Sequence, residues 1–168
     1  MSVPGRSCGD CSLCCKLLGV AELDKPQNVW CQHLVRANGC GIYETRPDAC
    51  RRFYCRWMKD PNMGPHWKPD KSKMVLAHLA EHQLSVYVDA GASGAWRREP
   101  YFSHLVAMAR TGLKNNAILK IIERGGVFVL LPDRVVDLGM VKPDEEILLI
   151  KRPVPGGFTY EVSVRRSE

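Results

Sequence analysis

The stretch Cys8-Gly-Asp-Cys11-Ser-Leu-Cys14-Cys15 opens the segment that decides the fold of the first third of this chain. The protein has 8 cysteines, and all of them lie between positions 8 and 55. Those that follow the opening run are Cys31, Cys40, Cys50 and Cys55. Repeated CxxC spacing presents several sulfurs to one ion. The sequence therefore predicts a metal site within residues 8–55.

Length and composition place this segment in an ordinary globular protein. The chain has 168 residues, of which 45% are hydrophobic and 25% are charged, and such values exclude a disordered or fibrous protein. We expect residues 1–60 to form a cysteine-cluster metal-binding module. Residues 61–168 should form an α+β region that packs on it, so that the two make one compact unit.

The predicted compartment decides between metal ligation and disulfides. No apolar run approaches the roughly 20 residues that cross a bilayer, and the first residues lack a secretory signal pattern. We therefore expect a cytoplasmic protein with no membrane association. Thiols stay reduced in that compartment, so dense cysteines indicate metal or redox chemistry, whereas four disulfides are the alternative for a secreted chain.

The positive charge of the chain has two interpretations. The net charge is +6 and the isoelectric point is near 9.0, but two zinc ions held by eight thiolates would reduce the charge to about +2. We expect Arg46, Arg51 and Arg52 to offset the thiolate charge and hydrogen-bond its sulfurs. Phosphate binding by these arginines is the alternative. His33 is a candidate extra ligand or a residue packed beside the site.

Local geometry around the cysteines predicts more than one centre. A short helix is expected within residues 12–20, and a second from Thr45 or Arg46 to about Trp57. On one continuous helix Cys50 and Cys55 would lie about 140° apart. Neighbouring side chains diverge, so Cys14 and Cys15 indicate either two centres or one ligand beside a spare thiol.

Several short motifs around the cysteines resemble a known family. Beyond the CxxCxxCC run, the motif residues are Lys25-Pro26, Cys31-Gln-His33, Gly39-Cys40-Gly-Ile-Tyr43, Arg46-Pro-Asp-Ala-Cys50-Arg, Phe53, Cys55 and Trp57. This pattern is similar to the YkgJ-type cysteine-cluster family, which is described as zinc- or iron-chelating. The resemblance covers the first third of the chain. It implies that the family's cysteine set comprises Cys8, Cys11, Cys14, Cys15, Cys31, Cys40, Cys50 and Cys55.

The chemistry of the cysteines leaves two kinds of cofactor open. The opening run resembles that of a bacterial ferredoxin, but no fourth Cys-Pro follows it. Eight thiolates also divide into two closed four-cysteine zinc sites. We favour zinc, as one or two ions, slightly over an iron–sulfur cluster. No open coordination position or nucleophile motif is evident, so no catalytic residue is predicted and an enzyme is not expected.

The cysteine-free part predicts a sheet with two helices. A linker is expected over residues 58–71, with His66 on the surface, and a hairpin over residues 74–79 and 84–88. That hairpin places the HxxEH string of His78 to His82 on strands, where it lacks zinc-protease geometry. Helices are expected from Pro100 to about Arg110, ended by Gly112, and over residues 115–123. Further strands are expected over residues 127–131, 134–138, 146–151 and 158–164.

Three function classes follow from these features. The first is a metal-binding protein with a mainly structural or interaction role. The second is an iron–sulfur electron-transfer protein or a component of an oxidoreductase. The third is a zinc-dependent nucleic-acid-binding module that would use Arg51, Arg52 and Arg56. The residues name no partner, although a protein partner fits such a module better than nucleic acid does.

Overall fold

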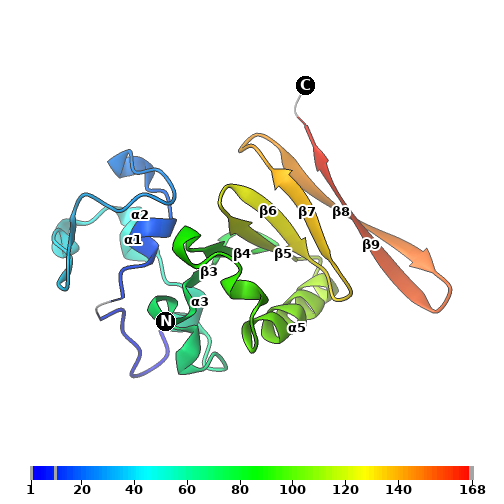
Figure 1. Cartoon of the computed structure of the whole chain (residues 1–168), viewed down its shortest axis with the longest axis horizontal. Helices are drawn as coiled ribbons and strands as arrows, with labels where there is room; N and C mark the ends of the chain where they lie inside the picture. Colours follow the sequence, from blue (N-terminus) through cyan, green and yellow to red (C-terminus); the bar gives the residue numbers. More distant parts are fainter. Residues whose placement is uncertain (1, 10, 167–168) are drawn as a thin grey trace.

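A five-stranded sheet lies at the centre of the molecule, as the computed structural model of residues 2–9 and 11–166 shows. The irregular cysteine-rich segment lies on one side of it, and a separate two-stranded hairpin lies on the other (Figure 1). Helices and strands are both present without regular alternation, so the α+β class is confirmed. Within the described residues, no helix is long and apolar enough to cross a membrane.

The central sheet is antiparallel except at one junction. Its strands, in spatial order, are β3 (Met74–Ala80), β4 (Gln83–Val88), β5 (Ile118–Glu123), β6 (Gly126–Leu130) and β7 (Val135–Met140). β4 and β5 are parallel, and a parallel pair needs a crossover connection. The crossover contains the short turns η4 (Ala90–Ala92) and η5 (Ala95–Arg97), followed by helix α5 (Tyr101–Lys114).

The two faces of the sheet bury different partners because side chains alternate along a strand. On one face, Leu76 and Val86 belong to the same buried cluster as Leu105 of α5. On the other face, Val75 and Tyr87 belong to a cluster with Leu17 of the cysteine-rich segment. The sheet is therefore the layer that joins the two halves of the chain.

The helix expected over residues 115–123 is wrong, because this segment is strand β5. Ile118, Leu119 and Ile121 are all buried, and a short run that is apolar on both sides does not distinguish a strand from a buried helix. Its isoleucines favour a strand once β4 lies beside it. The C-terminal half therefore contains one long helix, whereas the sequence predicted two.

Helix α5 also continues past the residue that was expected to end it. Gly112 lies inside the helix, and its carbonyl accepts hydrogen bonds from the backbone of Asn115 and Ala117 after the helix ends. A Cβ at Gly112 would lie 3.0 Å from the carbonyl oxygen of Ala117. The glycine therefore allows the chain to fold back closely into β5, which explains why it is present without ending the helix.

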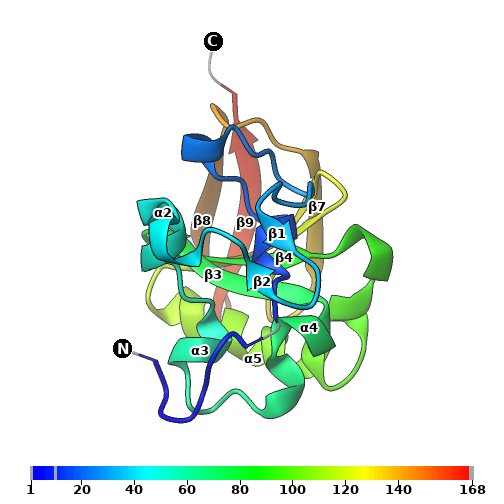
Figure 2. The same ribbon diagram turned by 90° about the vertical axis from the view of Figure 1, so that its left-hand side faces the viewer.

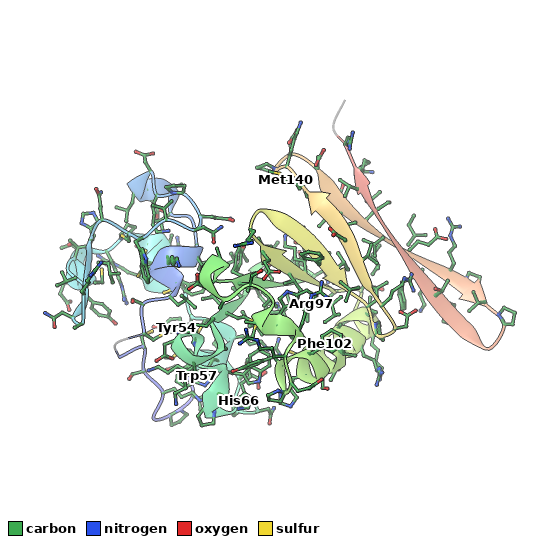
Figure 3. All side chains as sticks on the ribbon, in the orientation of Figure 1. Tyr54, Trp57, His66, Arg97, Phe102 and Met140 are labelled. Carbon is green, nitrogen blue, oxygen red and sulfur yellow. The ribbon has the colours of Figure 1, made fainter. Side chains whose placement is uncertain are left out.

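The remaining strands form the hairpin of β8 (Glu146–Val154) and β9 (Gly157–Arg165). Near its base, Ile147 and Val162 pack against the cluster that contains Val129 and Leu131. Toward its tip, Phe158 is 60% exposed. The strands expected after residue 126 are thus all present, but they form two sheets, and Met140 lies exposed at the end of β7 (Figure 3).

The segment expected to be a linker, residues 58–71, instead contains η3 (Pro65–Trp67) and α4 (Pro69–Ser72). Trp67 is buried, and its indole lies edge-on to Tyr101 with ring centroids 4.9 Å apart. The ring of His66 packs 5.8 Å from that of Tyr101. His66, which was expected on the surface, is half-buried, because its ring belongs to a cluster that anchors this segment to α5.

The cysteine-rich segment is mostly irregular. Its elements are α1 (Cys14–Leu17), η1 (Ala21–Leu23), β1 (Leu34–Val35), β2 (Gly39–Cys40), η2 (Tyr43–Thr45), α2 (Asp48–Arg52) and α3 (Arg56–Lys59). Between positions 19 and 54, all of which are described, Lys25 is the only buried residue. This part of the chain therefore has no hydrophobic core of its own.

Candidate metal centre

The break between α2 and α3 determines where the last two cysteines lie. One helix to about Trp57 was expected, but α2 ends at Arg52, and Phe53 and Cys55 have extended backbone with ψ of 124° and 158°. Cys50 therefore belongs to α2, while Cys55 is the N-cap of α3. The expectation of a single helix is wrong, and the break lets the two thiols face different neighbours.

A first set of thiols, defined as Cys8, Cys11, Cys14 and Cys55, gathers beside the sheet. The backbone N–H of Cys11 donates to the carbonyl of Cys8 over 2.8 Å. Cys11 and Cys14 pack against the buried cluster that contains Cys55. Cys55 interacts electrostatically with Cys8 and Cys11, as does Cys14. Residues more than 40 positions apart in the sequence are thus brought to one place.

Arg6 explains how the two ends of the first set meet. Its guanidinium donates to the carbonyl of Asp60 over 2.7 Å and to that of Met63 over 2.6 Å, and also to the carbonyl of Trp57. The same group lies 5.0 Å from the centre of the Trp57 ring. These hydrogen bonds hold the chain before Cys8 against α3, and the backbone N–H of Val3 also donates to the carbonyl of Met58 in α3 over 2.8 Å (Figure 1).

A second set, defined as Cys15, Cys31, Cys40 and Cys50, takes three members from the part of the chain without a core and one from α1. The backbone N–H of Cys31 donates to the carbonyl of Cys15 over 3.0 Å. The β1–β2 pairing brings Cys40 back opposite Leu34, whose N–H bonds the carbonyl of Cys31. Cys50 interacts electrostatically with all three other members.

The two sets adjoin at the neighbouring residues Cys14 and Cys15, whose side chains hydrogen-bond to each other. This bond raises the pKa of Cys14 well above its ordinary value, with burial and the thiols of Cys8 and Cys11 acting in the same direction. The bond also lowers the pKa of Cys15 to about 7, against the effect of burial and with help from Lys25 and Arg46. A thiol with such a lowered pKa is converted to thiolate more readily than an ordinary cysteine.

Three other thiols have raised pKa values, which show that it is unfavourable to bring several thiolates close together. Burial, followed by the charges of neighbouring cysteines, raises the pKa of Cys50, and in Cys55 these effects outweigh its backbone hydrogen bonds. Burial also raises the pKa of Cys11. Thiolates at these positions repel one another, and a bound cation would remove that repulsion.

Lys25 is a site residue that the charge analysis missed. Its ammonium group is buried and donates to the carbonyls of Leu18, Lys16 (3.2 Å) and Pro26 (3.0 Å). Burial lowers the pKa of Lys25, and four cysteines oppose that shift: Cys31, Cys15, Cys14 and Cys50. Lys25 thus supplies positive charge beside the thiols in addition to that of Arg46. In the sequence, only the presence of Lys25-Pro26 in the motif that resembles the YkgJ-type family indicated a role for this lysine.

The arginines and the histidine that were expected beside the thiols lie in different surroundings. The positive charge of Arg46 helps to lower the pKa of Cys15, and its guanidinium lies 3.8 Å from the centre of the Tyr43 ring. Arg51 donates instead to the backbone carbonyls of Arg46 and Glu44. Arg52 is 81% exposed. His33 contacts Gln32 at its ring, 3.4 Å away, and accepts from Gly41 at its carbonyl.

The cysteine thiols are ligands that a thiophilic ion prefers, but their positions in this structure do not form a coordination site. All eight cysteines are free thiols, and within residues 2–9 and 11–166 no three cysteine, histidine or carboxylate side chains come close enough to hold a metal ion as they stand. Eight sulfurs in two neighbouring sets match the four-thiolate sites of structural zinc and of iron–sulfur clusters. Ligation would require the thiols of each set to come closer together.

Comparisons with protein-family models, with curated proteins and with solved structures found no match to this chain. The likeness to the YkgJ-type family therefore rests on the motif residues alone, and the function has to be argued from the arrangement of the cysteines and their surroundings.

Proposed function

We propose that this chain is a cytoplasmic metal-binding protein in which the two cysteine sets hold metal and the metal has a mainly structural role. The observation that carries the proposal is the separation of eight thiols into two neighbouring groups of four. Each group combines residues from distant parts of the sequence, and each matches the ligand number of a closed four-thiolate site. A closed site stabilises a fold and has no position for substrate.

The missing core in residues 19–54 supports a structural role for the metal. Ordering each residue costs about 1–2 kcal/mol of backbone entropy, and Lys25, a charged residue, is the only residue buried there. One structural zinc ion contributes about 10–16 kcal/mol to folding. Metal at the second set would therefore replace the hydrophobic burial that this segment lacks.

Zinc is our first choice, and an iron–sulfur cluster with an electron-transfer role is the second. The buried ammonium of Lys25 and the nearby Arg46 surround the second set with positive charge, and such charge stabilises either kind of thiolate centre. Metal analysis and an absorption spectrum of protein purified without oxygen separate the two. Zinc gives a colourless protein, whereas a cluster absorbs near 400 nm and bleaches with dithionite.

Cysteine variants test the two-set arrangement directly. Cys55→Ser should remove the ion of the first set and Cys50→Ser that of the second, so each single variant should hold about half of the wild-type metal. The pair Cys8→Ser/Cys55→Ser lies within one set and should match Cys55→Ser alone. The pair Cys50→Ser/Cys55→Ser affects both sets and should hold no metal.

The same measurement can overturn the proposal. If the double variant within one set loses both ions, or if each single variant already loses all metal, two separate sites are excluded. If wild-type protein purified without oxygen contains neither zinc nor iron and remains folded in chelator, metal binding itself is excluded.

A further inference from the structure

A cavity of about 610 Å³ lies between α2, α3 and strand β3, outside the cysteine sets. These three elements lie next to one another on the same side of the molecule (Figure 2). The volume is within the range of small-molecule sites, about 300–1,000 Å³. The walls combine cationic side chains with apolar and aromatic surface, and their residues include Arg52, Arg56, Lys59, Asp60, Tyr54 and His78.

The charges in the cavity walls are unbalanced. Among the residues that the structure describes, Asp60 is the only carboxylate in the walls. Arg56 donates to it from Nε over 3.1 Å and from Nη2 over 2.9 Å. Lys59 has no carboxylate partner among the residues that the structure describes. Arg52 pairs with Asp48 over 3.9 Å, but both side chains are exposed, and such a pair contributes little. The described walls thus hold two more cations than carboxylates, and the exposed Arg52 and Lys59 are accessible to an anion.

His78 has a defined place in the wall because β3 is irregular there. The register of β3 against β4 shifts between Ala77 and Ala80, and such bulges redirect side chains and are common beside functional sites. Nε2 of His78 lies 2.9 Å from Nη1 of Arg56. Burial, together with the charges of Arg56 and Lys59, lowers the pKa of His78. The neutral imidazole therefore accepts from Arg56 and fixes the guanidinium in place.

The aromatic part of the wall indicates what the anion carries. The Tyr54 side chain is 44% exposed and Leu79 is 55% exposed, although both line the cavity. The ammonium of Lys59 lies 6.0 Å from the centre of the Tyr54 ring, so a cation and an open aromatic face stand next to each other. Stacking of a flat base on such a ring contributes about 1–3 kcal/mol, and a lysine ammonium binds phosphate.

We propose that this cavity binds a phosphorylated small molecule with a flat aromatic body, of the size and chemistry of a mononucleotide. Lys59 and Arg52 bind the phosphate, Tyr54 stacks on the aromatic ring system, and Arg56 is held in place by Asp60 and His78. This activity goes beyond the proposed function and does not depend on which metal the cysteines hold. Cys50 and Cys55 lie in the same segments as the walls, so metal content is measured on every sample.

The test is calorimetric titration of full-length, metal-analysed protein with AMP, adenosine and inorganic phosphate at low salt. AMP should bind at least tenfold more tightly than either fragment. Arg52→Met and Lys59→Met should each weaken AMP binding about tenfold, whereas Tyr54→Leu should weaken AMP without affecting phosphate. The matched control is Arg51→Met, because the adjacent Arg51 guanidinium binds backbone carbonyls away from the cavity and should leave affinity unchanged.

Several results would overturn the proposal. If protein with full metal content does not bind AMP at millimolar concentration, the cavity is excluded as a mononucleotide site, and the metal proposal is unaffected. Equal losses in Arg51→Met and Arg52→Met, or tight binding of a single-stranded oligonucleotide that depends equally on both arginines, would assign the charge to an extended nucleic-acid surface instead. Circular dichroism and metal content show whether each variant retains the wild-type fold.

Discussion

Residues 19–54 and the central sheet differ in what stabilises their structure. The first region buries one residue, Lys25, and brings three of its thiols together with Cys15. In the sheet, the first four residues of β3 and all but the first residue of β4 are buried. Hydrophobic burial therefore stabilises the sheet by itself, whereas the irregular region needs an additional source of free energy. The comparison predicts that the two regions respond to different perturbations.

Metal removal should give the largest difference between the two regions. In a chelator, residues 19–54 should lose the roughly 10–16 kcal/mol that each bound zinc supplies, while β3, β4 and β5 keep their buried contacts. Hydrogen-exchange mass spectrometry should then show fast exchange over residues 19–54 and continued protection in the sheet. Adding metal back is the control. Equal protection of residues 31–41 with and without chelator would contradict the proposed role of the ion.

Truncation of a side chain in the core beside the sheet should destabilise the sheet and leave metal binding by the irregular region unchanged. Trp96 is fully buried, and its indole N–H donates to Glu123 over 3.3 Å. Trp96→Ala should cost about 3–5 kcal/mol in urea unfolding, with metal content unchanged. Trp30, which is 48% exposed in the irregular region, is the control, and Trp30→Ala should cost less than about 1 kcal/mol. Similar losses in the two variants would contradict the assigned cores.

The ion pair between α1, which precedes the irregular region, and the end of β4 should have an intermediate effect. Lys16 contacts Asp89 at the end of β4 over 2.6 Å, and both side chains are largely shielded. Lys16→Met should cost about 1.5–3 kcal/mol at neutral pH, as expected for a hydrogen bond between charged groups. The measurement is urea unfolding of both proteins.

The pH dependence of this pair has a defined sign. Burial acts to raise the pKa of Asp89, but the Lys16 ammonium and the Gly91 N–H outweigh it and hold the pKa below its ordinary value of 3.8. A carboxylate with a lowered pKa stabilises the fold above the pKa of its unfolded state, and the contribution disappears as the pH falls through the folded value. The difference between wild type and Lys16→Met should therefore shrink below about pH 4. A constant difference would exclude Asp89 as the partner.

The exposed tip of the β8–β9 hairpin should give the smallest effect. Phe158 contacts the Lys151 ammonium, which lies 4.0 Å from the ring centre, and exposed cation–π contacts contribute about 0.5–1 kcal/mol. Phe158→Ser should therefore shift unfolding by no more than that. Leu131→Ala, at the buried base of the hairpin, should cost about 2–5 kcal/mol. A larger loss at the tip than at the base would show that the tip is packed in solution.

Much of the sheet was predictable from the sequence because its strands have local signals. The hairpin of β3 and β4 and the four strands after residue 126 follow from short β-rich runs separated by turns. Ile118–Glu123 was not predictable by the same reasoning, because periodicity does not distinguish a strand buried on both faces from a helix. Its neighbour β4 decides the outcome, and β4 is more than 30 positions away in the sequence.

The candidate site divides in the same way. Residue type and spacing alone determined that eight thiols in the first third of the chain are candidate metal ligands, and that Cys14 and Cys15 have different surroundings, since ligand chemistry and the divergence of neighbouring side chains are local properties. Only the tertiary structure decided which thiols share a set, that Lys25 lies among them, and that Arg6 joins Cys8 to Cys55. These facts depend on contacts between residues that are far apart in the sequence. Such contacts cannot be inferred from the residues that flank each contact position.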